Sequence, residues 1–149
     1  MGLACIEHKA TSYSLISYQT LQATRTLPLY DRLGEIRKGL NLFLDQTQPD
    51  VLALEDIFFA KNIKSAFTIG IARGIVFSAC LERNIRIFEY APTQVKSAVT
   101  GTGRADKAQV EKMLSMLLGV KLDQGFDASD AVAVALCHGV SNKPYLEIK

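Results

Sequence analysis

The chain has 149 residues, 48% of them apolar, with a nearly balanced formal charge of +2. This length suits one compact domain with a real core. The charge excludes a protein that binds nucleic acid through its net charge alone, so any basic binding surface must be local.

Cysteine usage and hydropathy indicate a cytoplasmic protein. Cys5, Cys80 and Cys137 form no C-x-x-C pair, which predicts reduced thiols, not a disulfide framework or a zinc site. No apolar run is long enough to span a bilayer, so we expect a soluble protein without membrane contacts.

The first third of the chain predicts strands followed by a helix. Residues 2–7 form a short apolar segment, and residues 11–24 alternate loosely, which predicts one or two antiparallel strands that pair with the first. Residues 29–46 carry apolar side chains at helical spacing. Gln48-Pro49-Asp50 ends that helix.

The next stretch, residues 51–62, is the centre of the functional interpretation. Val51 to Leu54 form a continuous apolar run, typical of a strand covered on both faces. It ends in Glu55-Asp56, where open α/β sheets bind their ligands. Aromatic, basic and amide side chains follow: Phe58, Phe59, Lys61 and Asn62. This order indicates a metal centre beside a nucleic-acid surface; the alternative is a charged strand end followed by two core phenylalanines.

Residues 62–82 predict a helix that is apolar nearly all round. Small residues recur at every fourth position: Ala66, Gly70, Gly74 and Ser78. Such a helix must be covered on all sides. Two interpretations stay open, namely tight packing within one subunit or a helix shared between the sheet and a partner subunit.

The second half alternates a strand with short helices. We expect a strand at residues 85–89, a short helix opened by residues 91–93, a glycine-rich loop at residues 100–107, and helices at residues 106–118 and 127–140. Together the elements predict a single α/β domain with a mixed central sheet flanked by helices.

Two carboxylates near the last helix start, Asp127 and Asp130, lie three residues apart and so on one face. Alone they fit a helix cap and a first-turn charge, each worth under about 1–2 kcal/mol. With Glu55 they form a candidate cage for Mg²⁺, which takes oxygen ligands. A pair of such ions promotes phosphodiester cleavage.

Other polar residues are assigned by position. His138 lies eight residues beyond Asp130, about 12 Å along a helix, so we expect a structural role. His8 is expected on the surface without a partner. Lys96, Arg104 and Lys107 form a candidate basic patch for phosphates around a loop that lacks the P-loop pattern; a plain surface loop is the alternative.

Several segments, in the same order along the chain, resemble the RuvC Holliday-junction resolvases. They are Leu27-Pro-Leu-x-x-Arg-Leu33, Leu54-Glu-Asp-Ile-Phe-Phe-Ala-Lys-Asn62, Ala72-Arg-Gly74, Phe88-Glu-Tyr-Ala-Pro-Thr-Gln-Val-Lys96, Gly101-Thr-Gly103, Lys107-x-Gln-Val110 and Asp127-Ala-Ser-Asp-Ala131. The resemblance implies an RNase H-like fold, a homodimer, Mg²⁺- or Mn²⁺-dependent paired nicking of four-way junction DNA, and a branch-migration motor complex of the RuvA and RuvB type as partner.

The resemblance also implies residue roles. Glu55, Asp127 and Asp130 match three members of the family's acidic tetrad, which hold the ions. The residues implied or suggested to contact DNA are Phe58, Lys61, Asn62, Lys96, Arg104 and Lys107. The helix with Ala72-Arg-Gly74 matches the family's dimer helix.

The N-terminal segment departs from the family pattern. The family opens its first strand with Asp-Pro-Gly, whose Asp is a central metal ligand, and no such triplet occurs here. Residues 2–6 match the second half of that strand. We therefore expect a resolvase chain that lacks its first strand half, and two functions stay open: a junction endonuclease, or a junction-binding dimer that cleaves poorly. A related RNase H-like nuclease is the weaker third alternative.

Overall fold

The computed structural model describes residues 1–9, 12–56, 63–123 and 125–141, with only the backbone described for 63–65. Its strands are β1 (Gly2–Lys9), β2 (Ser12–Thr20), β3 (Val51–Glu55) and β4 (Arg86–Tyr90). Its helices are α1 (Leu29–Thr47), α2 (Ile63–Leu81), α3 (Pro92–Thr100), α4 (Lys107–Leu118) and α5 (Phe126–Ser141). Every predicted element is therefore confirmed within a few residues.

The strands pair in two ladders, one antiparallel and one parallel. β1 and β2 run antiparallel from Gly2 opposite Thr20 to Lys9 opposite Ser12, with an irregularity after Cys5. β3 and β4 run parallel over their full length. Among the described residues these ladders remain separate, and β1 packs chiefly against β2 and α5. The mixed pairing was predicted, but the single continuous sheet was not found in this part of the chain.

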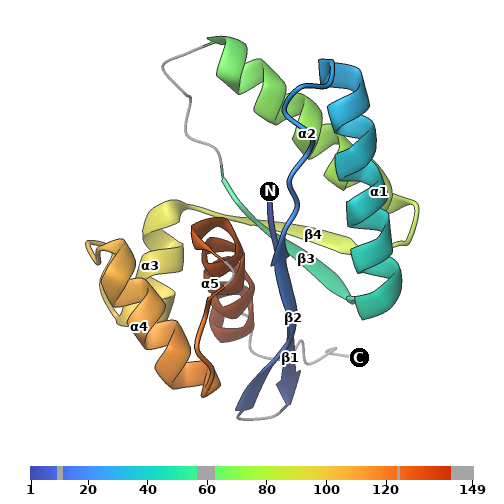
Figure 1. The fold of residues 1–149 in the computed structure, drawn as a ribbon. Helices are drawn as coiled ribbons and strands as arrows, with labels where there is room; N and C mark the ends of the chain where they lie inside the picture. The colour runs from blue at the N-terminus through green and yellow to red at the C-terminus, as the bar shows by residue number, and fades with distance from the viewer. Residues whose placement is uncertain (10–11, 57–62, 124, 142–149) are drawn as a thin grey trace.

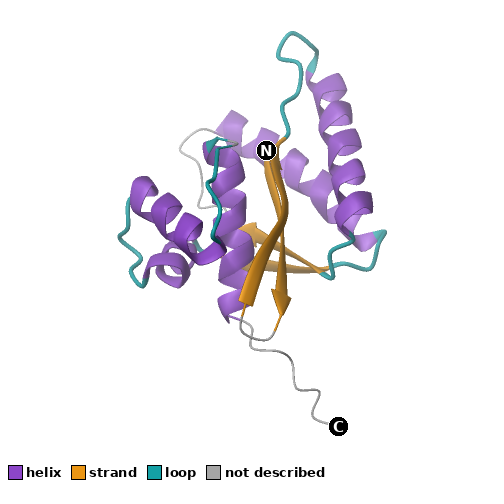
Figure 2. Ribbon diagram, turned by 60° about the horizontal axis from the view of Figure 1, so that its bottom comes forward, coloured by secondary structure: helices purple, strands orange, loops and turns teal. Residues whose placement is uncertain are grey.

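Helices cover the strands on two sides, as Figures 1 and 2 show. Helices α3, α4 and α5 form one layer, and α1 and α2 form the other. The period-two alternation of β1 explains why it serves both layers: Ala4 and Ile6 join the core on the α5 side, whereas Leu3 joins the core on the α1 and α2 side. The strands are thus the middle of three layers.

Local sequence signals set the helix ends. Asp106 caps α4 by accepting a hydrogen bond from the Gln109 backbone, and the Gln109 side chain accepts one from the Asp106 backbone in return. Helix α4 is followed by Gly119 in the left-handed conformation. This cap fixes the start of α4, and with it the position of Lys107, the first residue of the helix.

Helix α2 is covered on one side only. Val76, Ala79 and Cys80 are buried, whereas the Phe67 and Leu81 side chains are 69% and 66% exposed. An added Cβ at Gly70 or Gly74 would meet no heavy atom within 4 Å. The described residues of this chain therefore leave an open apolar face on α2.

All three cysteines are free, and burial raises the pKa of the Cys80 and Cys137 thiols, which suits unreactive core residues. Within the described ranges, no helix combines the length and apolar character that a bilayer span requires.

Candidate metal and nucleic-acid site

Glu55 is the last residue of β3. The preceding residues Val51 to Leu54 are half-buried between the helical layers, and the strand becomes exposed at Glu55. In the parallel register Glu55 lies opposite Tyr90, the last residue of β4. The side chain of Glu55 therefore leaves the carboxyl edge of this ladder, as the sequence predicted.

The two aspartates come from the start of α5. The helix begins at Phe126, so Asp127 lies in its first turn instead of capping it, and Asp130 follows three residues later. The helix dipole favours carboxylates here. The backbone of Gly2 lies directly against this turn, because a Cβ on Gly2 would stand 1.8 Å from the Asp127 carbonyl oxygen. Strand β1 thus fixes the position of the first turn of α5.

Glu55 and Asp130 lie close enough for their charges to interact. Partial burial raises the pKa of the Glu55 carboxyl, and the charge of Asp130 raises it further, while Lys107 and Lys96 act in the opposite direction. Lys107 Nζ lies 3.4 Å from Asp130 Oδ2 and 5.4 Å from the centre of the Phe126 ring. Two carboxylates and two lysines therefore share this edge.

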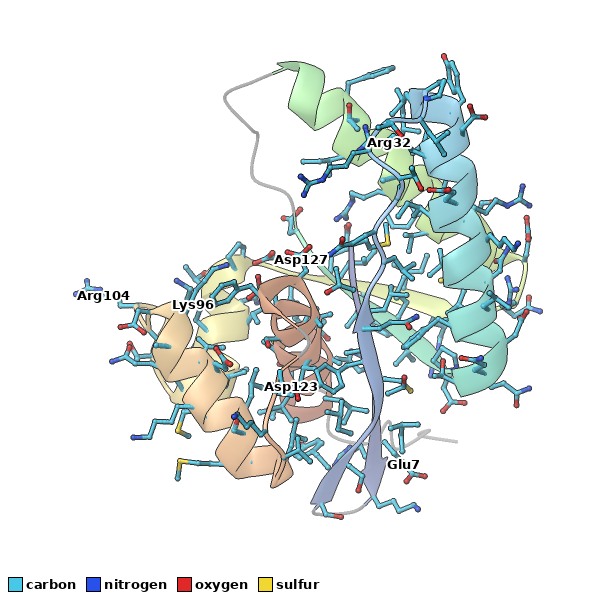
Figure 3. All side chains as sticks on the ribbon, in the orientation of Figure 1. Glu7, Arg32, Lys96, Arg104, Asp123 and Asp127 are labelled. Atoms are coloured by element: carbon cyan, nitrogen blue, oxygen red, sulfur yellow. The ribbon has the colours of Figure 1, made fainter. Side chains whose placement is uncertain are left out.

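The other predicted residues are placed differently. The Asp127 carboxylate lies 3.8 Å from the Met1 amino group, so its ion pair is with the chain terminus. Arg104 points outward, away from Asp127, in Figure 3, where Lys96 lies between them. Phe58, Lys61 and Asn62 lie outside the described residues, so their DNA contacts stay predictions.

The donor set can be tested against a divalent ion. In the part of the chain that the structure describes, no three His, Cys, Asp or Glu side chains are grouped closely enough to hold a metal. Mg²⁺, however, is commonly held by one or two carboxylates, with waters and substrate phosphates in its other positions. Glu55 and Asp130 fit that mode, and the ligand roles of all three acids stay predictions.

The histidines lie away from these acids. His138 Nδ1 lies 2.7 Å from the Tyr90 hydroxyl, its ring packs on Phe88, and burial, then Arg86, lowers its pKa. These contacts support the predicted structural role. The prediction that His8 has no partner is wrong: its ring stacks on Tyr13 at 4.6 Å, because the antiparallel register places the two residues opposite each other.

Sequence reasoning missed one residue next to the site. Arg73 of α2 donates a hydrogen bond from Nη1 to the backbone oxygen of Glu55 over 2.8 Å. Its position inside an otherwise apolar helix was a signal that it needs a specific partner, but the sequence does not identify a backbone acceptor.

The sequence matches the family model of the crossover junction endodeoxyribonuclease RuvC over residues 1–138. The chain belongs to the RuvC family. A RuvC protein of Caldicellulosiruptor saccharolyticus is 41% identical over 147 residues, covering 97% of this chain and 89% of the relative. A RuvC protein of Clostridioides difficile is 38% identical over 144 residues, covering 96% and 85%.

Solved RuvC structures have the same fold. The Thermus thermophilus RuvC in complex with a Holliday junction substrate is 30% identical, with a TM-score of 0.88 over 94% of this chain and 86% of that one. A second Thermus thermophilus RuvC structure gives a TM-score of 0.80 at 30% identity over 93% and 85%. The predicted RNase H-like fold class is thereby confirmed, and the RuvC family is one of metal-dependent endodeoxyribonucleases.

Proposed function

We propose that this chain is a structure-selective endonuclease that resolves four-way DNA junctions by paired nicking, through divalent-metal-assisted hydrolysis of phosphodiesters. The observation that carries the proposal is the shared site of Glu55 and Asp130 at the carboxyl edge of β3, beside two lysines. The RuvC relative solved with a Holliday junction substrate, which shares this fold, adds support for the substrate.

Each acid has a defined part in the proposal. Glu55, Asp127 and Asp130 hold Mg²⁺ or Mn²⁺, which when bound stabilises negative charge on the phosphate oxygens. Glu55 must lose its proton to bind a cation, and burial together with Asp130 makes that proton harder to lose. Glu55 and Asp130 would therefore repel each other less if they held a divalent cation between them.

The basic residues bind the DNA backbone. Lys107 Nζ lies 3.4 Å from Asp130 Oδ2, so it is held beside the acids, where its ammonium group would bind a phosphate. The charge of Lys96 also acts to lower the pKa of the Glu55 carboxyl. The remaining proposed DNA contacts are Phe58, Lys61, Asn62 and Arg104.

Paired nicking needs two sites, and we infer a homodimer through the open face of α2. Gly70 and Gly74 leave room for the backbone of a partner helix, and the exposed Phe67 supplies apolar area. A dimer with two-fold symmetry would place two equivalent candidate sites on one four-way junction. The proposal also includes a cytoplasmic location and a branch-migration motor of the RuvA and RuvB type as partner.

Cleavage of a synthetic four-way junction tests the proposal. We expect Mg²⁺- or Mn²⁺-dependent, symmetric nicks, and we expect the Glu55→Gln variant to lose them while it still binds the junction. Nicking that survives this substitution would assign the cleavage to another centre. Equal cleavage of plain duplex DNA would contradict the structure selectivity.

A junction-binding protein without cleavage is the second candidate. It is favoured by the lack of a three-acid group within the described ranges and by the engagement of Asp130 with Lys107. Retained junction binding with no nicks in either metal would support this candidate. Preference for RNA–DNA hybrids over branched DNA would instead indicate another RNase H-like nuclease.

A further inference from the structure

Arg73 joins helix α2 to the carboxyl ends of two strands. Its Nη1 atom donates to the Glu55 backbone oxygen over 2.8 Å, and its Nη2 atom donates to the Glu89 carboxylate. Its guanidinium carbon lies 5.3 Å from the centre of the Phe77 ring, one helical turn along α2. The side chain is only 17% exposed, so these contacts hold it in one place.

The two acceptors lie on neighbouring strands at the edge that carries the site. Glu89 pairs with Leu54, and Glu55 pairs with Tyr90 in the parallel register of β3 and β4. A planar guanidinium with fixed donors can bridge two such acceptors, which a flexible ammonium cannot do with the same geometry. Arg73 therefore ties both strand ends to one helix.

The contact with Glu55 uses the backbone and leaves the carboxylate available. Arg73 donates to the backbone oxygen of Glu55 and to the carboxylate of Glu89, not to the Glu55 carboxylate. An arginine paired with the carboxylate itself would compete with a cation for the same oxygens. An arginine bonded to the carbonyl fixes the residue without that competition.

We propose that Arg73 is a positioning residue, which holds the carboxyl end of β3 so that the Glu55 side chain faces Asp130. Glu89 and Phe77 orient Arg73 in turn. The inference rests on the proposed function in one respect, since it takes Glu55 as a metal ligand. The positioning itself is a statement about the strand end and can be measured without any metal.

The amide of Asp56 reports on that strand end, because it donates a hydrogen bond to the Tyr90 oxygen over 2.8 Å, just beyond Glu55. Hydrogen exchange at this amide is compared between wild type, Arg73→Gln and Arg73→Lys. We expect exchange to be at least about 10-fold faster in Arg73→Gln. The lysine variant keeps the positive charge but loses the planar set of guanidinium donors, so it is expected to recover only part of the protection of the Asp56 amide.

Arg83, two residues beyond the C-terminal end of α2, provides a matched control. It also donates to a backbone carbonyl, that of Ala79 at 3.0 Å, and to a carboxylate, that of Asp45 at 2.8 Å. Arg83→Gln thus removes an equivalent set of contacts away from the acids. We expect it to leave exchange at the Asp56 amide unchanged, while exchange at the Ile85 amide, which bonds to the Cys80 oxygen, becomes faster.

Manganese binding, followed by calorimetry, tests the consequence for the site. Loss of a residue that orients a metal ligand typically weakens metal binding by about 10–100-fold. We expect such a loss for Arg73→Gln, a smaller one for Glu89→Gln because the bond to the Glu55 oxygen remains, and none for Arg83→Gln. The Mg²⁺ concentration that gives half-maximal nicking is expected to rise in the same order.

The outcomes separate the two proposals. Unchanged exchange at Asp56 in Arg73→Gln, or faster exchange spread evenly over the whole chain, would overturn the positioning role. If Glu55→Gln binds Mn²⁺ as tightly as the wild type, the metal role of Glu55 fails, and exchange at Asp56 alone then decides whether Arg73 holds the strand end. Weaker Mn²⁺ binding together with locally faster exchange supports both.

Discussion

Replacement of Gly2 by alanine is expected to disturb the candidate site through the backbone. A Cβ on Gly2 would lie 1.8 Å from the Asp127 carbonyl oxygen and 2.4 Å from its carbon. Ordinary contacts begin near 3.4 Å, so the first turn of α5 must withdraw from β1 by about 1.6 Å. Both neighbours are backbone, so no side chain can rotate to relieve the clash.

The expected cost follows from that displacement. Overpacking of this kind lowers the free energy of unfolding by about 1–3 kcal/mol, which for a chain of this length lowers the melting temperature by about 2–12 °C. Asp127 and Asp130 move with the turn, and a misplacement of about 1 Å can reduce catalysis about 100-fold. Thermal unfolding and the rate of junction nicking measure the two effects.

Two other glycines serve as controls for Gly2→Ala. Gly34→Ala on α1 meets no atom within 4 Å, so it is expected to be neutral or to stabilise by up to about 1 kcal/mol. Gly139→Ala, at the far end of α5, meets a Tyr13 ring carbon at 2.6 Å; it is expected to destabilise the fold without the large loss of nicking. The reasoning is refuted if Gly2→Ala melts and cleaves like the wild type, or if Gly139→Ala loses as much activity.

Three further predictions address the dimer, the charge at the site and the core. Gly74→Ala is expected to weaken self-association, measured by sedimentation, without destabilising the monomer, whereas Gly34→Ala leaves self-association unchanged. Burial and the charge of Asp130 raise the pKa of the Glu55 carboxyl in the folded state, so the free energy of unfolding falls as the pH rises from the unfolded-state pKa of Glu55 to its folded-state pKa. At neutral pH the Glu55→Gln variant should therefore melt at a higher temperature than the wild type, and this difference should disappear on acidification. Tyr90→Phe removes the 2.7 Å hydrogen bond to His138 and is expected to cost about 1 kcal/mol in urea unfolding.

Local patterns were enough to predict the elements of this fold. The apolar run before Glu55 predicted a strand, and the amphipathic pattern of residues 106–118 predicted α4. These signals depend only on neighbours within a few residues, so they can be interpreted before the fold is known. The same reasoning placed Glu55 at a strand end and both aspartates at the start of a helix.

Contacts between distant elements were beyond that reasoning. The stacking of His8 on Tyr13 depends on the strand register, in which a shift of one residue turns a side chain to the other face. The bond from Arg73 to the Glu55 oxygen depends on how α2 is placed over β3, and a backbone acceptor leaves no trace in the sequence. The environments of Asp127 and Asp130 also differ, although both lie on one face of one helix.

The proposed function explains why opposite charges stand side by side at the candidate site. Binding of a DNA backbone requires positive charge, but a site that also holds divalent ions requires carboxylates at the same place. Here Lys96 and Lys107 stand beside Glu55 and Asp130, so the opposite charges cancel within the site itself. A bound cation would neutralise the acids and leave the lysines as a basic surface, so the affinity for junction DNA should rise with divalent metal even where no strand is cut.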